Sequence, residues 1–167
     1  ATAGAYAGSA TQNGVVEAPR GNITIAGKQI SQNGALVSTT SVSLNGRIDL
    51  SAHYDAIQNP NYGASGSGQA SPFLHRKSGH ISLGADSLLR ILPEWDSRET
   101  AIGSELALRS QINLAGRTIH FGAESTLLAP NALVDVKAGD WLTTGSGTTL
   151  LSRFVQSSGQ VYLDRWA

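Results

Sequence analysis

The chain has 167 residues, which is long enough for one domain with a buried core. Charged residues make up only 14% and cancel, 12 basic against 12 acidic, so nothing in the composition attracts nucleic acid or an anionic membrane broadly. Cysteine is absent, which excludes disulfides and thiolate metal sites, and no apolar run reaches the length of a membrane span.

The first part of the chain sets up a short repeating pattern. Residues 1–20 are small and polar around one apolar pair, Val15 and Val16, and we expect them to form an incomplete coil. From Gly21 onward, apolar pairs recur with Gly and Asn between them. The pairs are Ile23/Ile25, Leu36/Val37, Val42/Leu44 and Ile48/Leu50. Alternation over three to five residues turns one side chain inward and the next outward, so this stretch predicts short strands separated by tight corners.

A first interruption, about residues 52–78, has the chemistry of turns and flexible linkers and predicts a projecting loop. It gathers more aromatic and basic residues than the rest of the chain. Aromatic rings stack on pyranose faces while His and Arg donate hydrogen bonds to hydroxyl groups, so the loop is a candidate glycan-binding site. The candidate residues are Tyr54, Tyr62, Phe73, His75 and Arg76. The alternative is that these side chains fix the loop to the flank of the scaffold.

A second interruption, about residues 89–104, carries the densest charge in the chain, and its Trp95 is a further candidate for glycan binding. Glu94 and Asp96 could act as the acid and base of a glycosidase or as calcium ligands. A solvated loop with Arg98 as counter-charge is, however, the preferred interpretation. No catalytic residue is therefore assigned. Because the two interruptions leave neighbouring coils, they could meet in space.

The pattern is clearest between Glu105 and Val136, where apolar pairs follow one another in steps of six to eight residues. Leu106 and Leu127 are 21 residues apart, and Ile112 and Val134 are 22 apart, so three short strands complete one coil. This constant period favours an all-β fold in which the strands form a parallel β-helix. The alternative is an antiparallel sandwich or barrel, in which a gap such as Asn45-Gly46 would form a hairpin.

The last part of the chain continues the pattern less regularly. Thr143–Thr149 is predicted to be a polar corner after Trp141. Apolar pairs resume at Phe154/Val155 and Val161/Leu163. We expect residues 1–167 to form a single segment of a longer chain, because methionine is missing even at position 1.

Four stretches resemble the repeats of filamentous haemagglutinin-type exoproteins. They are Gly21–Gly27, Leu44–Leu50, Ile112–Gly116 and Val134–Asp140. The resemblance implies a right-handed parallel β-helix with three short strands per coil, secreted or held at the bacterial cell surface, and exported by an outer-membrane partner in two-partner secretion. It implies an adhesive role. Together with the residues of the two interruptions, this predicts a secreted adhesin or biofilm-matrix protein with host or bacterial glycans or exopolysaccharide as partners. Asn59-Pro60-Asn61 matches the export signature of that family in three residues only, so we expect shaft rather than export signal.

The remaining polar residues suggest no cofactor and no metal site. His53, His75, His80 and His120 do not form a ligand set, and His80 and His120 fall at predicted outward positions. Two other functions stay open: a polysaccharide-degrading β-helix enzyme, and a passive spacer of a toxin-delivery filament. The enzyme would need carboxylates from adjacent coils to meet, such as Asp49 with Asp86 or Glu94. The bare ends of a coil stack predict flanking coils or end-to-end association.

Overall fold

The computed structural model describes residues 8–42, 44–52, 55–58, 62, 73–76, 79–100, 109–144, 153–157 and 160–164. Within these ranges the chain forms strands and no helix, so the predicted all-β class is confirmed. Most of the strands belong to three sheets in which every neighbouring pair runs parallel.

The first sheet contains β1 (Ser9–Gln12), β4 (Gln29–Gln32), β9 (His80–Leu83), β12 (Thr118–Phe121) and β17 (Gln160–Leu163). The second sheet contains β2 (Val15–Ala18), β5 (Ala35–Thr40), β10 (Leu88–Pro93) and β13 (Thr126–Leu128). The third sheet contains β3 (Asn22–Ala26), β6 (Arg47–Ser51), β11 (Gln111–Gly116) and β14 (Leu133–Ala138).

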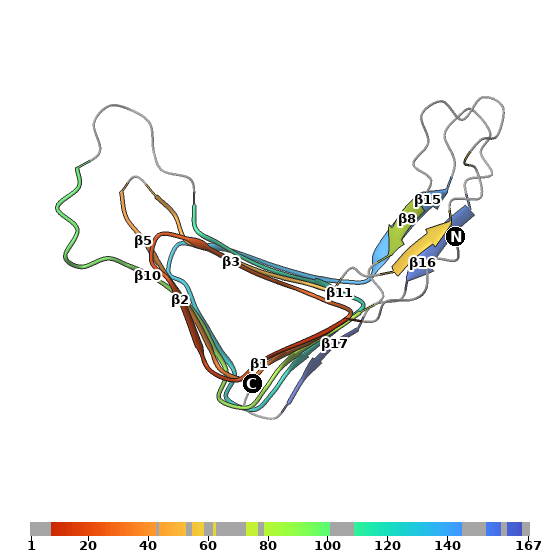
Figure 1. Ribbon diagram of the computed structural model, residues 1–167, viewed down its shortest axis with the longest axis horizontal. Helices are drawn as coiled ribbons and strands as arrows, with labels where there is room; N and C mark the ends of the chain where they lie inside the picture. Colours follow the sequence, from red (N-terminus) through yellow and green to blue (C-terminus); the bar gives the residue numbers. More distant parts are fainter. Residues whose placement is uncertain are drawn as a thin grey trace.

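The chain visits the three sheets in turn, and we call one strand from each sheet a circuit. The described strands make four circuits and the first-sheet strand of a fifth. Figure 1 shows the three sheets as the sides of a triangle, with strands of successive circuits stacked on one another. Parallel pairing in all three stacks is consistent with a parallel β-helix and contradicts an antiparallel sandwich for these strands.

The inward side chains form continuous apolar rows through the triangle. Ile23, Ile48, Ile112 and Val134 occupy one row of the third sheet. Ile112 and Val134 are direct register partners, so the prediction that these 22 residues make one circuit is confirmed. Ile30, Ile81 and Ile119 form a corresponding row in the first sheet, each at most 1% exposed. Full burial of one such side chain stabilises a fold by about 1.5–3 kcal/mol, so these rows are the main source of stability.

The first interruption leaves the scaffold between the third and first sheets, as expected from its turn residues. Its described strands, β7 (Asp55–Gln58) and β8 (Phe73–Arg76), pair antiparallel. A second hairpin-like pair, β15 (Asp140–Thr144) and β16 (Arg153–Ser157), leaves at the equivalent corner two circuits later. Both pairs project at the upper right of Figure 1.

The β15–β16 pair corrects two expectations. Thr143 and Thr144 lie on a strand rather than in a corner, and Phe154/Val155 pairs with that strand instead of continuing the coil. The cause is cross-strand pairing, because Thr143 and Leu142 are the register partners of Phe154 and Val155. Alternation of apolar and polar residues is the same in a hairpin and in a coil, so the pattern does not distinguish them.

The second interruption begins later than predicted. Leu89 and Ile91 are 0% and 1% exposed on β10, and the chain leaves the scaffold only after Pro93. It leaves between the second and third sheets, on the opposite side of the triangle in Figure 1. The two interruptions therefore do not meet in the ranges that the structure covers. Val42 and Leu44, expected on a strand, lie in the corner after β5 and are 41% and 51% exposed.

Candidate functional site

The outward face of the second sheet carries an unusual mixture of apolar and charged side chains. Glu17, Val37, Arg90 and Leu128 are neighbours in register across four circuits. They alternate along their strands with inward residues such as Leu36 and Leu89, both 0% exposed. Because neighbouring strands lie about 4.8 Å apart, this row runs along the stacking direction of the circuits. A ligand lying along the row would contact several circuits at once.

A groove of about 460 Å³ lies over this face. Val37 and Leu92 give it an apolar floor, and Glu17 and Arg90 are charged groups along it. The rest of the lining comes from Ser38 and Thr39 of β5, from Pro93 at the end of β10, and from the chain that follows it, Glu94 to Asp96. Trp95 is 88% exposed, so most of its indole ring is open to a ligand. Apolar surface with a few placed polar groups is the usual composition of a binding site.

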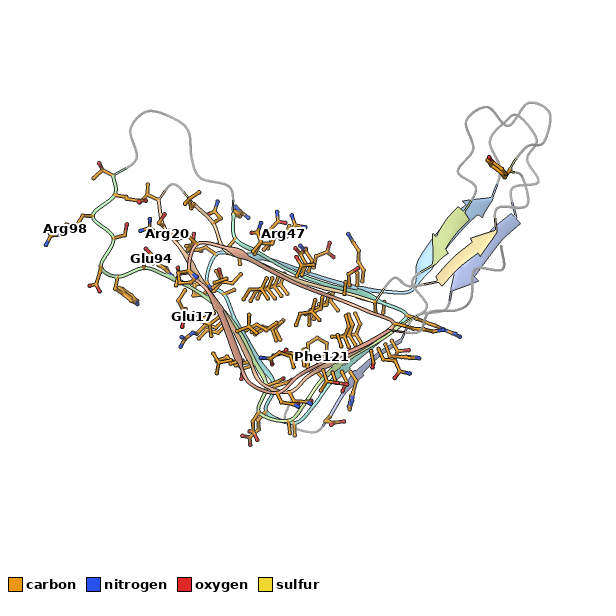
Figure 2. The ribbon with its side chains drawn as sticks, in the orientation of Figure 1. Glu17, Arg20, Arg47, Glu94, Arg98 and Phe121 are labelled. Atoms are coloured by element: carbon orange, nitrogen blue, oxygen red, sulfur yellow. The ribbon has the colours of Figure 1, made fainter. Side chains whose placement is uncertain are left out.

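An ion pair between distant segments holds this part of the chain in place. Arg20 Nε and Nη2 donate hydrogen bonds of 2.8 and 2.6 Å to Glu94 Oε2, and Thr39 Oγ1 donates one of 2.7 Å to Glu94 Oε1. The Glu94 backbone N–H donates to the Thr40 carbonyl oxygen at 2.9 Å. Arg20 also pairs with Glu99 at 2.8 Å. We call these contacts the Arg20 clamp; Figure 2 shows Arg20 and Glu94 together at one corner of the triangle.

The Arg20 clamp joins three consecutive circuits. Arg20 follows β2 with a backbone φ of 56°, Thr39 lies on β5, and Glu94 follows β10. The side chains of Arg20 and Glu94 are 33% and 21% exposed, so the pair is partly shielded from solvent. Two Arg20 donors share one oxygen of Glu94 and Thr39 donates to the other, so this partly shielded contact fixes geometry better than an exposed ion pair does. The clamp thus anchors the residue that precedes Trp95.

The hydrogen bonds from Arg20 and then Thr39 lower the pKa of the Glu94 carboxyl below its ordinary value. The same contact with Glu94 raises the pKa of Arg20. A general acid in glycoside hydrolysis needs a raised carboxyl pKa so that it holds a proton near neutral pH. Glu94 has the opposite shift, which suits a permanently ionised anchor.

The other charged residues of the groove are free to meet a ligand. Glu17, Arg90 and Asp96 make no hydrogen bond or ion pair through their side chains in the part of the chain that the structure covers. Carboxylates accept hydrogen bonds from sugar hydroxyl groups, a guanidinium group donates up to five, and an indole face stacks on a pyranose ring. The groove therefore offers all three kinds of contact that glycan recognition uses.

The structure separates the residues predicted to bind glycans. Trp95 lies at the groove, whereas Phe73, His75 and Arg76 lie on β8 at the other side of the triangle (Figure 1). Tyr62 is 59% exposed in the first interruption, and Tyr54 lies outside the described residues. The predicted set is therefore not a single site. Sequence reasoning missed Glu17, Arg90 and the Arg20 clamp, which become neighbours only through the register of distant strands.

The carboxylates that an enzyme would have to bring together lie in different parts of the fold and have other surroundings. Asp49, on the third sheet, accepts hydrogen bonds from Arg47 Nε at 2.6 Å and Asn113 Nδ2 at 2.7 Å. Asp86 occupies the corner between the first and second sheets, and Glu94 belongs to the Arg20 clamp. The structure therefore does not bring Asp49 together with Asp86 or Glu94, as the enzyme hypothesis would require.

Two further features of the described ranges bear on site chemistry. They contain no group of three or more His, Asp or Glu side chains arranged to hold a metal ion. His80 and His120 lie at outward positions of the first sheet, as predicted, and His120 Nε2 lies 2.8 Å from Asp164 Oδ1. The described ranges also contain no helix that is long and apolar enough to cross a membrane.

Comparison with known proteins gives no relative. The chain matches no family model, no curated protein and no solved structure. The groove on the second sheet is therefore interpreted from its own geometry.

Proposed function

We propose that this chain is a segment of the shaft of a secreted bacterial adhesin or biofilm-matrix exoprotein, and that it binds glycans through the groove on the second sheet. The shaft is a right-handed parallel β-helix with three short strands per circuit, of the filamentous haemagglutinin type. The observation that supports the binding role most strongly is the exposed Trp95 beside the apolar floor of Val37 and Leu92. Exposed aromatic residues on a rigid scaffold are typical of recognition sites.

Several features of the groove support sugar as the ligand class. Its lining combines apolar and charged side chains, so it suits a ligand that is apolar on one face and rich in hydroxyl groups at its edges. A pyranose ring has this character, since its axial C–H groups form an apolar face. The proposal also includes export by an outer-membrane partner and contact with flanking circuits, which follow from the family resemblance and from the apolar side chains at the stack ends.

The test is retention of the purified chain on immobilised bacterial and host polysaccharides, with release of new reducing ends recorded in parallel. We expect retention without release, and loss of retention in Trp95→Ala by about tenfold, which corresponds to about 1.4 kcal/mol, because the variant lacks the exposed aromatic face. Tyr62→Ala is the matched control, because Tyr62 is an exposed aromatic residue outside the groove. Loss in Tyr62→Ala alone would move the site to the first interruption, and release of sugar ends would make the protein an enzyme.

A further inference from the structure

The charges along the groove do not balance once the Arg20 clamp is taken into account. Three carboxylates, Glu17, Glu94 and Asp96, line the groove with Arg90. Arg20 neutralises Glu94 through two hydrogen bonds, which leaves Glu17 and Asp96 against Arg90. The groove therefore has an excess of one negative charge, although the chain as a whole is neutral. A cationic ligand would be attracted to it, and an anionic ligand would meet carboxylates of its own sign.

The positions of these charges match an extended ligand. Glu17 on β2 and Arg90 on β10 are separated in register by Val37 on β5, so they lie about 10 Å apart along the stacking direction. Asp96 and Trp95 follow β10 and complete the lining beyond it. A sugar residue in an extended chain has about the length of the strand separation. Successive sugars can therefore meet successive circuits.

Trp95 and Asp96 form a suitable pair for a protonated amine. A cation is attracted electrostatically to the face of an indole ring. The carboxylate of Asp96, the next residue in the chain, adds an ion pair, and Glu17 on β2 offers a second carboxylate in the lining. Arg90 on β10 donates to hydroxyl or acetyl oxygens, because a guanidinium has donors only.

We infer that the groove selects glycans that carry protonated amino groups, such as chains of partly or fully deacetylated amino sugars. This inference depends on the proposed glycan-binding function and adds the chemical class of the ligand. Neutral glycans bind through Trp95 and the apolar floor alone. Acidic glycans, such as chains of uronic acids, bind least.

The experiment compares three oligosaccharides of equal length by titration calorimetry with the full 167-residue chain. The probes are a glucosamine oligomer, its N-acetylated counterpart and a galacturonate oligomer, at mildly acidic pH where amines are protonated and carboxylates ionised. We expect the glucosamine oligomer to bind best, by about tenfold over the acetylated one, with an advantage that decreases as salt is added.

Single substitutions test whether the carboxylates of the groove attract the protonated amines. Glu17→Gln and Asp96→Asn are each expected to weaken binding of the glucosamine oligomer about two- to fivefold, as for an exposed ion pair, with little effect on the acetylated oligomer. Asp86→Asn, an exposed carboxylate outside the groove, is the control and should change neither. Circular dichroism spectra and urea unfolding curves establish that each variant is folded.

The outcomes separate this inference from the function on which it depends. Equal binding of the amino and acetylated oligomers, or tighter binding of the galacturonate oligomer, would overturn the selectivity for amines and leave glycan binding intact. An equal effect of Asp86→Asn would also overturn it, since the attraction would then not come from the groove. Failure of the folded chain to bind any of the three, together with no retention on polysaccharides, would overturn both.

Discussion

At the scale of single residues, the groove depends on contacts between side chains that are far apart in sequence. Arg20 and Glu94 are 74 positions apart, and Thr39 is 55 positions from Glu94. Glu94 is next to the exposed Trp95, so its anchoring also limits where the indole can lie. No local pattern could have predicted these contacts, because they require both the register of three circuits and the point at which the chain leaves β10.

The Arg20 clamp predicts a specific pH dependence of stability. Ionised Glu94 is favoured in the folded state, because its pKa there lies below the ordinary value of 4.5. Its contribution is therefore complete above that value and is lost as the pH falls through the lower folded-state pKa. We expect Glu94→Gln to unfold at lower urea than the wild type at neutral pH, and the difference to disappear in acid.

Urea unfolding followed by circular dichroism over a series of pH values measures this effect. Glu124→Gln is the matched control, since the Glu124 carboxylate makes no ion pair in the described ranges. A difference between the wild type and Glu94→Gln that stayed constant into acid would show that the clamp does not act through the charge of Glu94.

At the scale of strands and corners, much of the fold was predictable. The alternating pairs Ile48/Leu50 and Ile112/Leu114 are buried inward residues, because alternation reports directly on which face of a strand is buried. The pattern failed at Val42 and Leu44, which are exposed in a corner. The inward position before them is filled by Ser38, 0% exposed, whose single hydroxyl hydrogen is within donating distance of two carbonyl oxygens, those of Ala18 at 3.0 Å and Gly21 at 2.9 Å. Because this buried position is polar, the apolar pattern does not mark the end of β5 and instead places a strand at Val42 and Leu44.

A pair of equivalent corners provides a second prediction. Gly14 and Gly34 occupy the corner between the first and second sheets in successive circuits. A Cβ atom at Gly34 would collide with the carbonyl oxygen of Gly14 and lie 2.6 Å from Gln12 Oε1, whereas one at Gly14 would meet nothing within 4 Å. We expect Gly34→Ala to destabilise the fold by about 1–3 kcal/mol and Gly14→Ala to leave it nearly unchanged.

The free energy of unfolding of both variants, from urea titration, checks this prediction. Similar values for the two substitutions would mean that these circuits are not stacked as closely as the collision at Gly34 requires.

At the scale of the whole molecule, the stack of circuits has open edges. β13 and β14 are the outermost strands of their sheets among the described residues, and they carry partly exposed Leu128, Leu133 and Val134. Val134 continues the inward row of Ile48 and Ile112 but is 44% exposed, because no described strand pairs with β14 on its other side. Unpaired edges with apolar side chains favour association with further strands.

This edge predicts self-association of the isolated chain. We expect its average mass in sedimentation to rise with concentration, and Val134→Lys to reduce that rise because a charge in the apolar row is unfavourable to bury. Lys137→Ala, on the outward face of the same strand, is a control that keeps the row intact. A wild-type chain that stays monomeric at all concentrations would show that the edge is not adhesive.

The most direct test of glycan binding at the second sheet is an NMR titration of the chain with an oligosaccharide that the retention experiment selects. We predict that the indole N–H signal of Trp95 and the methyl signals of Val37 and Leu92 shift together and saturate at one concentration. Signals from the outward face of the first sheet, such as Ser31 and Ser82, should not move. Shifts confined to β7 and β8, or no shift at Trp95 while the sugar is bound, would contradict the assignment of the groove.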